Sequence, residues 1–439
     1  MAKNFHEIRD PIHVFIRLTT DERQVVDSIP FQRLRNIHQL AMSYLVYPGA
    51  THKRFEHSLG VMELASRVYD IVTAQDNIHP KVRELIPEIS MEAKLIYWRN
   101  VLRMAALCHD LGHLPFSHAA EKLLLPDGWD HERLTVECIN CKEMKKIWES
   151  MTPPLRVDDI VKLAVGPKKL KSITFTDWEA ILSEIITGDA FGVDRIDYLL
   201  RDSHHVGVAY GKFDHFRLID TLRILPKSSE VEESNEPALG IQEGGLHSAE
   251  ALLLARYFMY TQVYFHPVRR IYDIHLCDFL LGFLKGGKFS TDIYDLQKIS
   301  DADVISEIWK ANLDKGHSLN DIANRIVMRA HFRRLYEKNP EDLSYNPHIG
   351  KVVFNEARKA FGSENIRRDS YSPSGDIFDF PVLRNNARIT SSYVLSETLQ
   401  RLPIASFDYV FIRPDLLKDG QAWLEKNLEN MLSMVEKEE

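Results

Sequence analysis

Apolar positions along the chain recur mostly with the period of a helix. Five of them mark one face of an amphipathic helix over residues 55–72: Phe55, Leu59, Met62, Ala65 and Tyr69. Residues 98–110 are apolar on nearly all sides, which predicts a buried helix, with Gly112 in the left-handed conformation that often follows a helix end. Further helices are expected over residues 191–207 and over 251–284, the second one interrupted near Pro267.

Strand signals are short, and they lie at residues 238–242 and 407–414. The pattern therefore predicts a mainly α protein with a little β. We expect a helical core over residues 1–225 and a polar linker or surface excursion over residues 226–238. A mainly helical C-terminal lobe over residues 239–439 follows, and its start is expected to complete the active site.

Composition narrows the class of protein. The chain has 439 residues, of which 44% are hydrophobic and 27% charged, as in soluble globular proteins. The net charge of −8 argues against broad binding to nucleic acid or to an anionic membrane, although a local basic pocket is compatible with it. We find no apolar run long enough to span a membrane and no signal peptide, so a cytoplasmic protein is expected.

The cysteines point the same way. Four of them, Cys108, Cys138, Cys141 and Cys277, are too few for a disulfide framework and suit a reducing compartment. Cys138 and Cys141 form one C-x-x-C pair without a second pair, so we expect polar helix surface there rather than a metal or redox site.

The stretch LCHDLGHLPFSH, residues 107–118, holds candidate chemistry. His109 and Asp110 are adjacent at the end of the predicted buried helix, where side chains about 100° apart can both reach a point beyond the helix end. A divalent metal is such a point, since imidazole and carboxylate are both metal ligands. His57 and Asp194, from two other predicted helices, complete an H…HD…D set.

This set and its flanks resemble a known family. RDPIHVFIRL, FQRLRNIHQL, YPGATHKRFEHSLGV, CHDLGHLPFSH, WDHER and DRIDYLLRDSHHVG are similar to the HD-domain deoxynucleoside triphosphate (dNTP) triphosphohydrolases, without their SAM domain. The resemblance implies an HD-domain helical core and a helical C-terminal lobe. It also implies a divalent ion, whether Mn, Fe, Ni, Co, Zn or Mg, on His57, His109, Asp110 and Asp194, with Mg²⁺ accompanying the nucleotide.

The reaction that the resemblance implies is hydrolysis of a dNTP to deoxynucleoside and inorganic triphosphate. In that reaction His118 would be the acid for the leaving 5′-oxygen and His113 would contact phosphate. His131, paired with Glu121, matches a histidine–acid pair beside the scissile phosphate.

Substrate contacts are implied at seven positions: Gln39, Leu40, Arg54, Arg195, Tyr198, Asp202 and Tyr264. The two arginines would hold phosphate, because a guanidinium donates two parallel hydrogen bonds. Asp202 would accept the sugar 3′-hydroxyl, and its spacing from Asp194 places both on one helix face. Tyr260 and Phe265 depart from the family pattern, which leaves the base preference open.

A regulatory site is also implied. Asp27, Gln32 and Arg35 match the family's site for an activating guanine nucleotide, and Asp214 and Arg217 match a second activator position. These sites lie between subunits in the family, so a homotetramer or dimer is expected. The nearby His6, Glu7 and Arg9 differ from the pattern, which leaves the activator's identity open.

Plainer interpretations compete with each of these. The helix face with Asp194, Tyr198 and Asp202 could simply be solvated, Arg54 could form a surface ion pair, and Asp27 could pair with an arginine on an ordinary helix surface. Two other functions also remain open at this point. One is another HD phosphohydrolase, acting on a monophosphate, cyclic dinucleotide or alarmone; the other is a nucleotide sensor or nucleic-acid-binding scaffold with little turnover.

Overall fold

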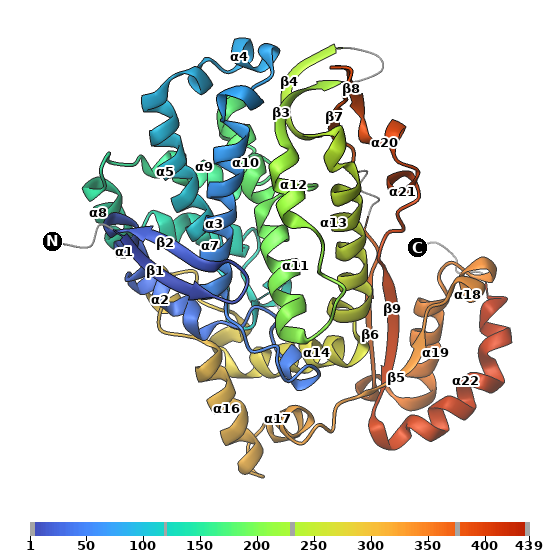
Figure 1. Ribbon diagram of the computed structural model, residues 1–439. Helices are drawn as coiled ribbons and strands as arrows, with labels where there is room; N and C mark the ends of the chain where they lie inside the picture. The colour runs from blue at the N-terminus through green and yellow to red at the C-terminus, as the bar shows by residue number, and fades with distance from the viewer. Residues whose placement is uncertain (1–4, 118–120, 229–232, 374–377, 435–439) are drawn as a thin grey trace. The chain divides into compact units, whose positions relative to one another are not determined.

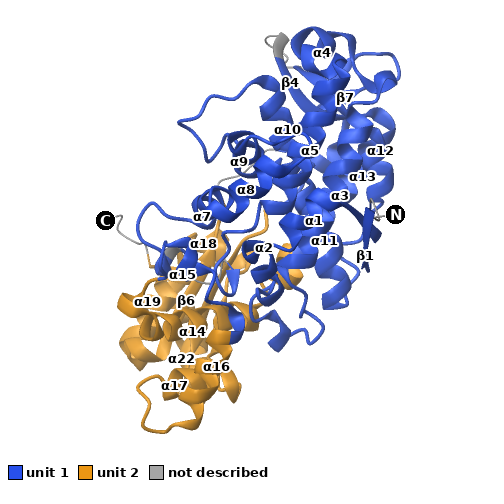
Figure 2. Cartoon of the chain, turned by 90° about the vertical axis from the view of Figure 1, so that its left-hand side faces the viewer, with its two compact units in different colours: residues 1–259, 289–302, 377–403 blue, residues 260–288, 303–376, 404–439 orange. Residues whose placement is uncertain are grey.

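The computed structural model describes residues 5–117, 121–228, 233–373 and 378–434 (Figure 1). The described chain is mainly helical and carries three small sheets, which confirms the predicted fold class. It divides into two compact units (Figure 2). Unit 1 comprises residues 1–259, 289–302 and 377–403, and unit 2 comprises residues 260–288, 303–376 and 404–439. The domain boundaries expected at residues 225 and 238 stay a prediction.

Helices dominate unit 1. In chain order they are α1 Thr20–Val26, α2 Ile29–Arg33, α3 Arg54–Val72, α4 Pro80–Leu85, α5 Glu92–Cys108, α6 Glu121–Leu124, α7 His131–Ile139, α8 Lys142–Ser150, α9 Val157–Val165, α10 Asp177–Thr187, α11 Val193–Val206, α12 His215–Thr221, α13 Leu246–Met259, α15 Ile293–Leu296, α20 Ser392–Leu395 and α21 Glu397–Gln400. Helix α3 packs on both α5 and α11, and α9 packs on α5 and α10.

Two sheets belong to unit 1. Strands β1 Phe5–Asp10 and β2 Val14–Thr19 form an antiparallel hairpin. The second sheet has the order β3-β4-β7-β8, from β3 Leu222–Ser228, β4 Glu233–Gln242, β7 Pro381–Leu383 and β8 Ile389–Ser391. Residues 226–228 and 233–238, expected as a linker or excursion, are thus strand residues of the β3–β4 hairpin.

Unit 2 has a three-stranded antiparallel sheet in the order β5-β9-β6. Its elements are β5 Arg333–Glu337, β6 Ile366–Tyr371, β9 Phe407–Ile412, α14 Pro267–Phe283, α16 Asp301–Leu313, α17 Asn320–Val327, α18 Pro340–Tyr345, α19 Ile349–Phe361 and α22 Leu417–Leu432, and α16 begins in unit 1. Val353 of α19 and Met431 of α22 pack with Val410 and Ile412 of β9 in one core cluster. The strand signals at 238–242 and 407–414 are confirmed, and so is the helix break at Pro267.

Helix α3 is more buried than its pattern predicts. Besides the five expected positions, Ser58, Val61 and Ser66 are also buried, because α5 and α11 both cover it. Gly60 allows the close approach of α11: a Cβ there would lie 2.0 Å from Asp197 Oδ1. The helix expected to be one-sided is therefore a central helix of the unit.

Two expectations near the H-D pair are wrong. Helix α5 ends at Cys108, and Gly112 is not among the residues with positive φ. Gly112 is required for another reason, since a Cβ there would lie 2.2 Å from His131 O at the start of α7. Cys138 of the C-x-x-C pair is also buried rather than on a polar surface, because its helix α7 packs on α9.

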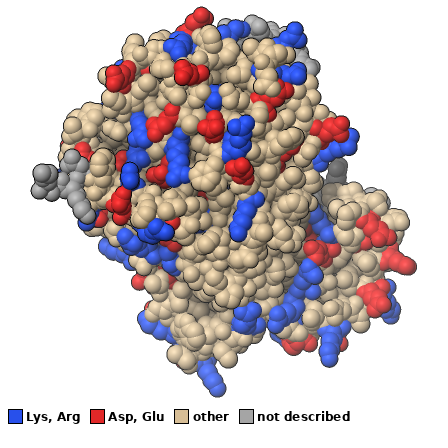
Figure 3. Space-filling model, in the orientation of Figure 1, with Lys and Arg blue, Asp and Glu red and all other residues tan. Residues whose placement is uncertain are grey.

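The outer surface carries both signs of charge. In the upper part of the face in Figure 3, Lys and Arg side chains lie among Asp and Glu, whereas the lower middle of this face is largely uncharged. Among the described helices, none combines the length and the apolar character that a membrane span requires.

Candidate metal centre

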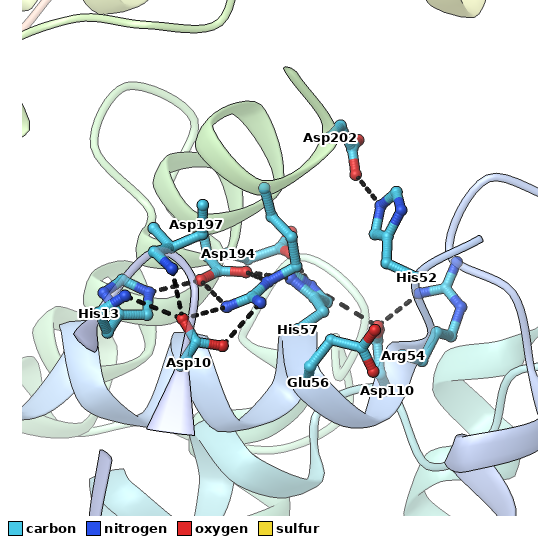
Figure 4. A network of polar contacts seen from close by, with 12 residues as sticks. Asp10, His13, His52, Arg54, Glu56, His57, Asp110, Asp194, Asp197 and Asp202 are labelled. Carbon is cyan, nitrogen blue, oxygen red and sulfur yellow. Dashed lines mark hydrogen bonds and ion pairs between the residues drawn. The ribbon is translucent and has the colours of Figure 1, made fainter. Parts of the chain in front are cut away.

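Three segments of unit 1 carry the four candidate ligands, and Figure 4 shows three of these, His57, Asp110 and Asp194, close to one another. Helix α3 contributes His57, the end of α5 contributes His109 and Asp110, and α11 contributes Asp194. His57 Nε2 lies 3.0 Å from Asp194 Oδ1 and 3.7 Å from Asp110 Oδ2. His109 Nε2 lies 3.3 Å from Asp110 Oδ1 and 3.5 Å from Asp194 Oδ1. Both carboxylates thus lie within 4 Å of both imidazoles.

This arrangement fits a divalent cation. One ligand atom each from His57, His109 and Asp110 lies within 4.8 Å of the others, and all three residues are buried. His109 Nδ1 is held 2.8 Å from Ala106 O, and its buried Nε2 has no hydrogen-bond partner among the described residues. A buried imidazole nitrogen held among carboxylates is a preformed ligand for Zn, Mn, Fe, Co or Ni, and the donor set does not distinguish between them.

The pKa values of both carboxylates at the centre lie below their usual range. Burial opposes charge on Asp110, but the Arg54 guanidinium and the rings of His109 and His113 hold its pKa well below the usual range. Burial likewise opposes charge on Asp194, and the nearby rings of His109 and His57 nevertheless lower its pKa. Both carboxylates therefore favour the ionised form, which is the form that binds a cation.

Behind His57 lies a residue that the sequence did not single out. Asp197 Oδ2 is 2.8 Å from His57 Nδ1, and Asp197 also contacts His13 Nε2 at 2.7 Å and Arg201 Nε at 2.8 Å. Burial disfavours the imidazolium of His57, yet hydrogen bonds with Asp194 and Asp197 raise its pKa to about 10. A carboxylate behind a metal-binding histidine fixes the ring and its tautomer. The available signal was the spacing of Asp197, three residues after Asp194 on α11.

The two described histidines of the predicted catalytic set stack on each other. Their rings, His113 and His131, have centroids 4.1 Å apart. His113 Nε2 lies 3.2 Å from Asp110 Oδ1, and His131 Nδ1 lies 2.8 Å from Glu121 Oε1. Burial and Arg54 hold the pKa of His113 well below its usual value, whereas the pKa of His131 is raised: burial opposes this, but the hydrogen bond with Glu121 prevails. His118 lies outside the described residues.

Both candidate phosphate-binding arginines are engaged by protein groups. Arg54 is buried, it donates to Asp110 Oδ2, and its Nε donates to Ser117 Oγ at 2.7 Å. The alternative of a surface ion pair for Arg54 is therefore wrong. Arg195 donates to Gly188 O at 2.9 Å and pairs with Asp189 at 3.1 Å.

The candidate sugar-binding carboxylate is buried as well. Asp202, one turn before the end of α11, lies 2.7 Å from His52 Nε2, and the His52 ring stacks on His205 at 4.5 Å. A fully solvated face for this part of α11 is thereby excluded. Gln39 N donates to His52 O at 3.1 Å, so it lies beside the same histidine.

The remaining predicted substrate residues are Tyr198, Leu40 and Tyr264. Tyr198 is half-buried on α11, and Leu40 is buried. Tyr264 belongs to unit 2, where its ring meets that of Tyr260 at 5.1 Å, and its part in a substrate site stays a prediction.

The residues matched to the activator site form local pairs. Asp27 pairs with Arg23 at 3.1 Å rather than with Arg35. Gln32 donates to Val26 O at 2.7 Å and accepts from Arg35 Nε at 2.9 Å. Arg35 also lies over the Phe55 ring at 3.5 Å.

The second activator position is equally local. Asp214 caps α12 by accepting from Arg217 N at 3.0 Å, and Arg217 Nε donates to Gly244 O at 3.3 Å. Both activator sets therefore stay predictions.

Comparison with known proteins places this geometry in a family. Residues 54–202 match the HD domain, a range that begins at Arg54 and ends at Asp202, and residues 213–402 match the HD associated region. The chain belongs to the HD-domain phosphohydrolase family.

Relatives of this HD phosphohydrolase cover most of its length. It is 35% identical to an uncharacterized protein of Methanocaldococcus jannaschii over 79% of this chain and 62% of that protein. It is 31% identical to the deoxynucleoside triphosphate triphosphohydrolase SAMHD1 of Homo sapiens over 76% of this chain and 55% of that one. The chain thus spans less than two thirds of either curated relative.

A solved structure supports the fold along nearly the whole chain. A hypothetical protein of Aquifex aeolicus has 32% sequence identity and a TM-score of 0.75, with coverage of 96% of this HD phosphohydrolase and 100% of the other chain.

Proposed function

We propose that this HD phosphohydrolase is a metal-dependent dNTP triphosphohydrolase, which converts a dNTP to deoxynucleoside and inorganic triphosphate. One observation carries the proposal: Asp202, buried and held by His52, follows the metal centre on the same helix that supplies Asp194. A carboxylate at this position can accept a hydrogen bond from the sugar hydroxyl of a nucleotide. The named activity of the SAMHD1 relatives points the same way.

His57, His109, Asp110 and Asp194 would hold the ion. When bound, a divalent ion supplies a nucleophilic water near neutral pH and polarises a phosphate oxygen. The chain's own part is to orient these ligands, and Asp197 does so for His57.

The leaving 5′-oxygen requires a proton from the protein. We assign this role to His118 from its match to the family pattern, with the His131–Glu121 pair beside the scissile phosphate and His113 on phosphate. Glu121 accepts from His131 Nδ1 at 2.8 Å, which fixes the imidazole ring against His113. Arg54 and Arg195 would exchange Asp110 and Asp189 for triphosphate oxygens, which match the fork of a guanidinium.

The sugar would be selected by Asp202. An ionised carboxylate accepts hydrogen bonds and cannot donate them, so it recognises a hydroxyl. The 3′-hydroxyl of the substrate is the expected donor, with Gln39, Leu40, Tyr198 and Tyr264 around the sugar.

Activation by a nucleotide is the further part of the proposal. Asp27 would accept from the guanine edge, with Gln32 and Arg35 beside it, and Asp214 and Arg217 would contact a second nucleotide. A homotetramer or dimer would complete these sites.

The first experiment incubates the protein with Mn²⁺ or Mg²⁺ and each dNTP, singly and in mixtures, and separates the products by chromatography. Deoxynucleoside with intact triphosphate is the expected result, and turnover only in mixtures would reveal an activator. If all dNTPs stay intact while metal is bound, the proposal is wrong, and monophosphates, cyclic dinucleotides and alarmones become the substrates to assay.

A second measurement concerns the sugar. The wild-type protein should prefer dGTP to 2′,3′-dideoxy-GTP, and Asp202→Ala should lose about tenfold or more of that preference in kcat/KM. Equal discrimination in both proteins would remove Asp202 from the proposed sugar site.

A further inference from the structure

Residues 289–302, the return segment, belong to unit 1 although the chain before and after them belongs to unit 2 (Figure 2). We propose that Asp301 of this segment is a positioning residue that holds the HD loop, residues 113–117, in the conformation needed for hydrolysis. Asp301 itself touches none of the four candidate ligands. The effect on dNTP hydrolysis rests on the proposed function, whereas the support of the HD loop does not.

Asp301 is 1% exposed and holds two different chain segments with its two oxygens. Oδ1 accepts from Phe116 N at 2.7 Å. Oδ2 accepts from His38 N at 2.7 Å and lies 2.6 Å from His38 Nδ1. The carboxylate therefore links the HD loop to the segment before α3.

The HD loop has a backbone that requires such support. Phe116 has φ 59° and Ser117 has φ 58°, so two successive residues with side chains adopt the left-handed conformation. A Cβ is disfavoured there, and such strain persists only where the surroundings fix it. Asp301 accepts directly from the Phe116 amide. His38, which Asp301 also holds, accepts from Ser117 Oγ through its backbone oxygen at 3.1 Å.

The supported loop reaches the metal centre through one side chain. Ser117 Oγ accepts from Arg54 Nε at 2.7 Å, and Arg54 in turn donates to Asp110. A shift of Ser117 would therefore move the arginine that we assign to phosphate.

The return segment also holds the start of the HD loop. Arg33 is buried and donates to His113 O at 2.8 Å and to Ile299 O at 3.1 Å. The segment thus fixes the loop at His113 and at Phe116. Because residues 289–302 lie within the matched HD associated region, that region has a specific task here, the support of the HD loop.

The test compares Asp301→Asn with a matched control in the same segment. An asparagine keeps one acceptor oxygen but turns an NH₂ group toward the donors of Phe116 or His38. Asp295→Asn makes the same chemical change at an exposed carboxylate that pairs with Lys298 at 2.9 Å. For both variants the readouts are metal content, kcat and KM for dNTP, melting temperature, and deuterium uptake of peptides covering residues 111–117.

We expect Asp301→Asn to lower kcat about tenfold or more at a temperature well below its melting point, with metal content unchanged and faster deuterium uptake in the HD loop. The control should match the wild-type protein. Asp301→Glu keeps both acceptor oxygens and should give an intermediate kcat, and it decides the matter if the asparagine variant does not fold.

Wild-type kcat and wild-type uptake in both Asp301 variants would overturn the inference. So would a kcat that merely follows the melting temperature, because a structural role alone predicts that relation. If the wild-type protein hydrolyses no dNTP, the proposed function fails, and deuterium uptake alone then decides whether Asp301 holds the loop.

Discussion

The metal centre and the activator-matched surface, both in unit 1, each contain acidic side chains paired with basic ones. They differ in how buried these side chains are and in whether an atom is left without a hydrogen-bond partner. At the centre, ligand atoms of His57, His109 and Asp110 gather at one buried place, with Asp194 Oδ1 3.0 Å from His57, and His109 Nε2 has no hydrogen-bond partner in the described chain. On the surface, Asp27 follows the end of α1 and pairs with Arg23 of that helix, and both side chains are more than half exposed.

The difference teaches how a site can be recognised in a structure without a ligand. Burying a polar group is costly unless it is paired, so a buried imidazole nitrogen without a hydrogen-bond partner among the described residues, close to two carboxylates, indicates a place for an ion. An exposed pair has little such cost, since water solvates each partner. Contacts within the single chain therefore support the metal centre, but they do not test whether the surface around Asp27 binds an activator.

The largest effect is expected from Asp110→Ala. Loss of this ligand should remove the metal and lower turnover at least about a thousandfold, because the transition state loses its ion. Metal content by atomic emission and product analysis provide the measurement. Asp70→Ala, at an exposed carboxylate paired with Arg99, is the control and should behave as wild type. An Asp110→Ala protein that keeps its metal would contradict the assignment.

Next comes Asp197→Asn, which leaves every ligand in place. Metal affinity should fall about 10- to 100-fold, because the His57 ring loses its orienting carboxylate. Competition with a chelator measures this affinity. Asp159→Asn replaces another buried carboxylate, which accepts from Tyr97 OH at 2.6 Å, and should lower stability without changing metal affinity. Equal affinities in the two variants would mean that Asp197 only stabilises the fold.

A third change concerns Glu184, a partly buried carboxylate that forms no ion pair within 4 Å among the described residues. Burial raises the pKa of Glu184 to about 7, and the Leu239 N–H lowers it only in part. Since the folded pKa lies above the unfolded value, Glu184 contributes most to stability below pH 4.5, and this contribution is lost as pH rises to 7. Glu184→Gln should therefore stabilise the protein above pH 7 by up to about 3 kcal/mol and lose this advantage near pH 4.5.

Urea unfolding at pH 5 and pH 8 measures the effect. The matched control is Glu179→Gln, because Glu179 is buried but paired with Lys162 at 2.9 Å. That variant should lose stability at pH 8 rather than gain it. A Glu184→Gln protein that is less stable than wild type at pH 8 would show that the carboxylate is compensated after all.

The smallest effect on the isolated chain is expected from Asp27→Ala. Removing an exposed ion pair should change the free energy of unfolding by less than about 1 kcal/mol. Basal hydrolysis and metal content should stay at wild-type levels, while stimulation by a guanine nucleotide is lost. Assays with and without added nucleotide make this comparison. Unchanged stimulation would make the region an ordinary helix surface.

Much of this protein was readable from its sequence. The helical period over residues 55–72, 98–110 and 191–207 predicted α3, α5 and α11, because helix formation depends on neighbours a turn away. The H-D pair, with His57 and Asp194 in characteristic flanks, identified the candidate ligands. The substrate and activator residues came from resemblance alone, and their roles stay predictions.

Other features appeared only with the tertiary structure. Asp301 is separated from Phe116 by 185 residues and from His38 by 263, and no local pattern announces such a pairing. The close approaches of α11 to Gly60 and of α7 to Gly112 likewise depend on how helices pack, which misled the expectation of a left-handed Gly112. The sequence by itself determined which helices form and which residue types could hold an ion. Packing decided which carboxylates are buried together and which backbone is held under strain, because those energies arise between segments distant in the chain.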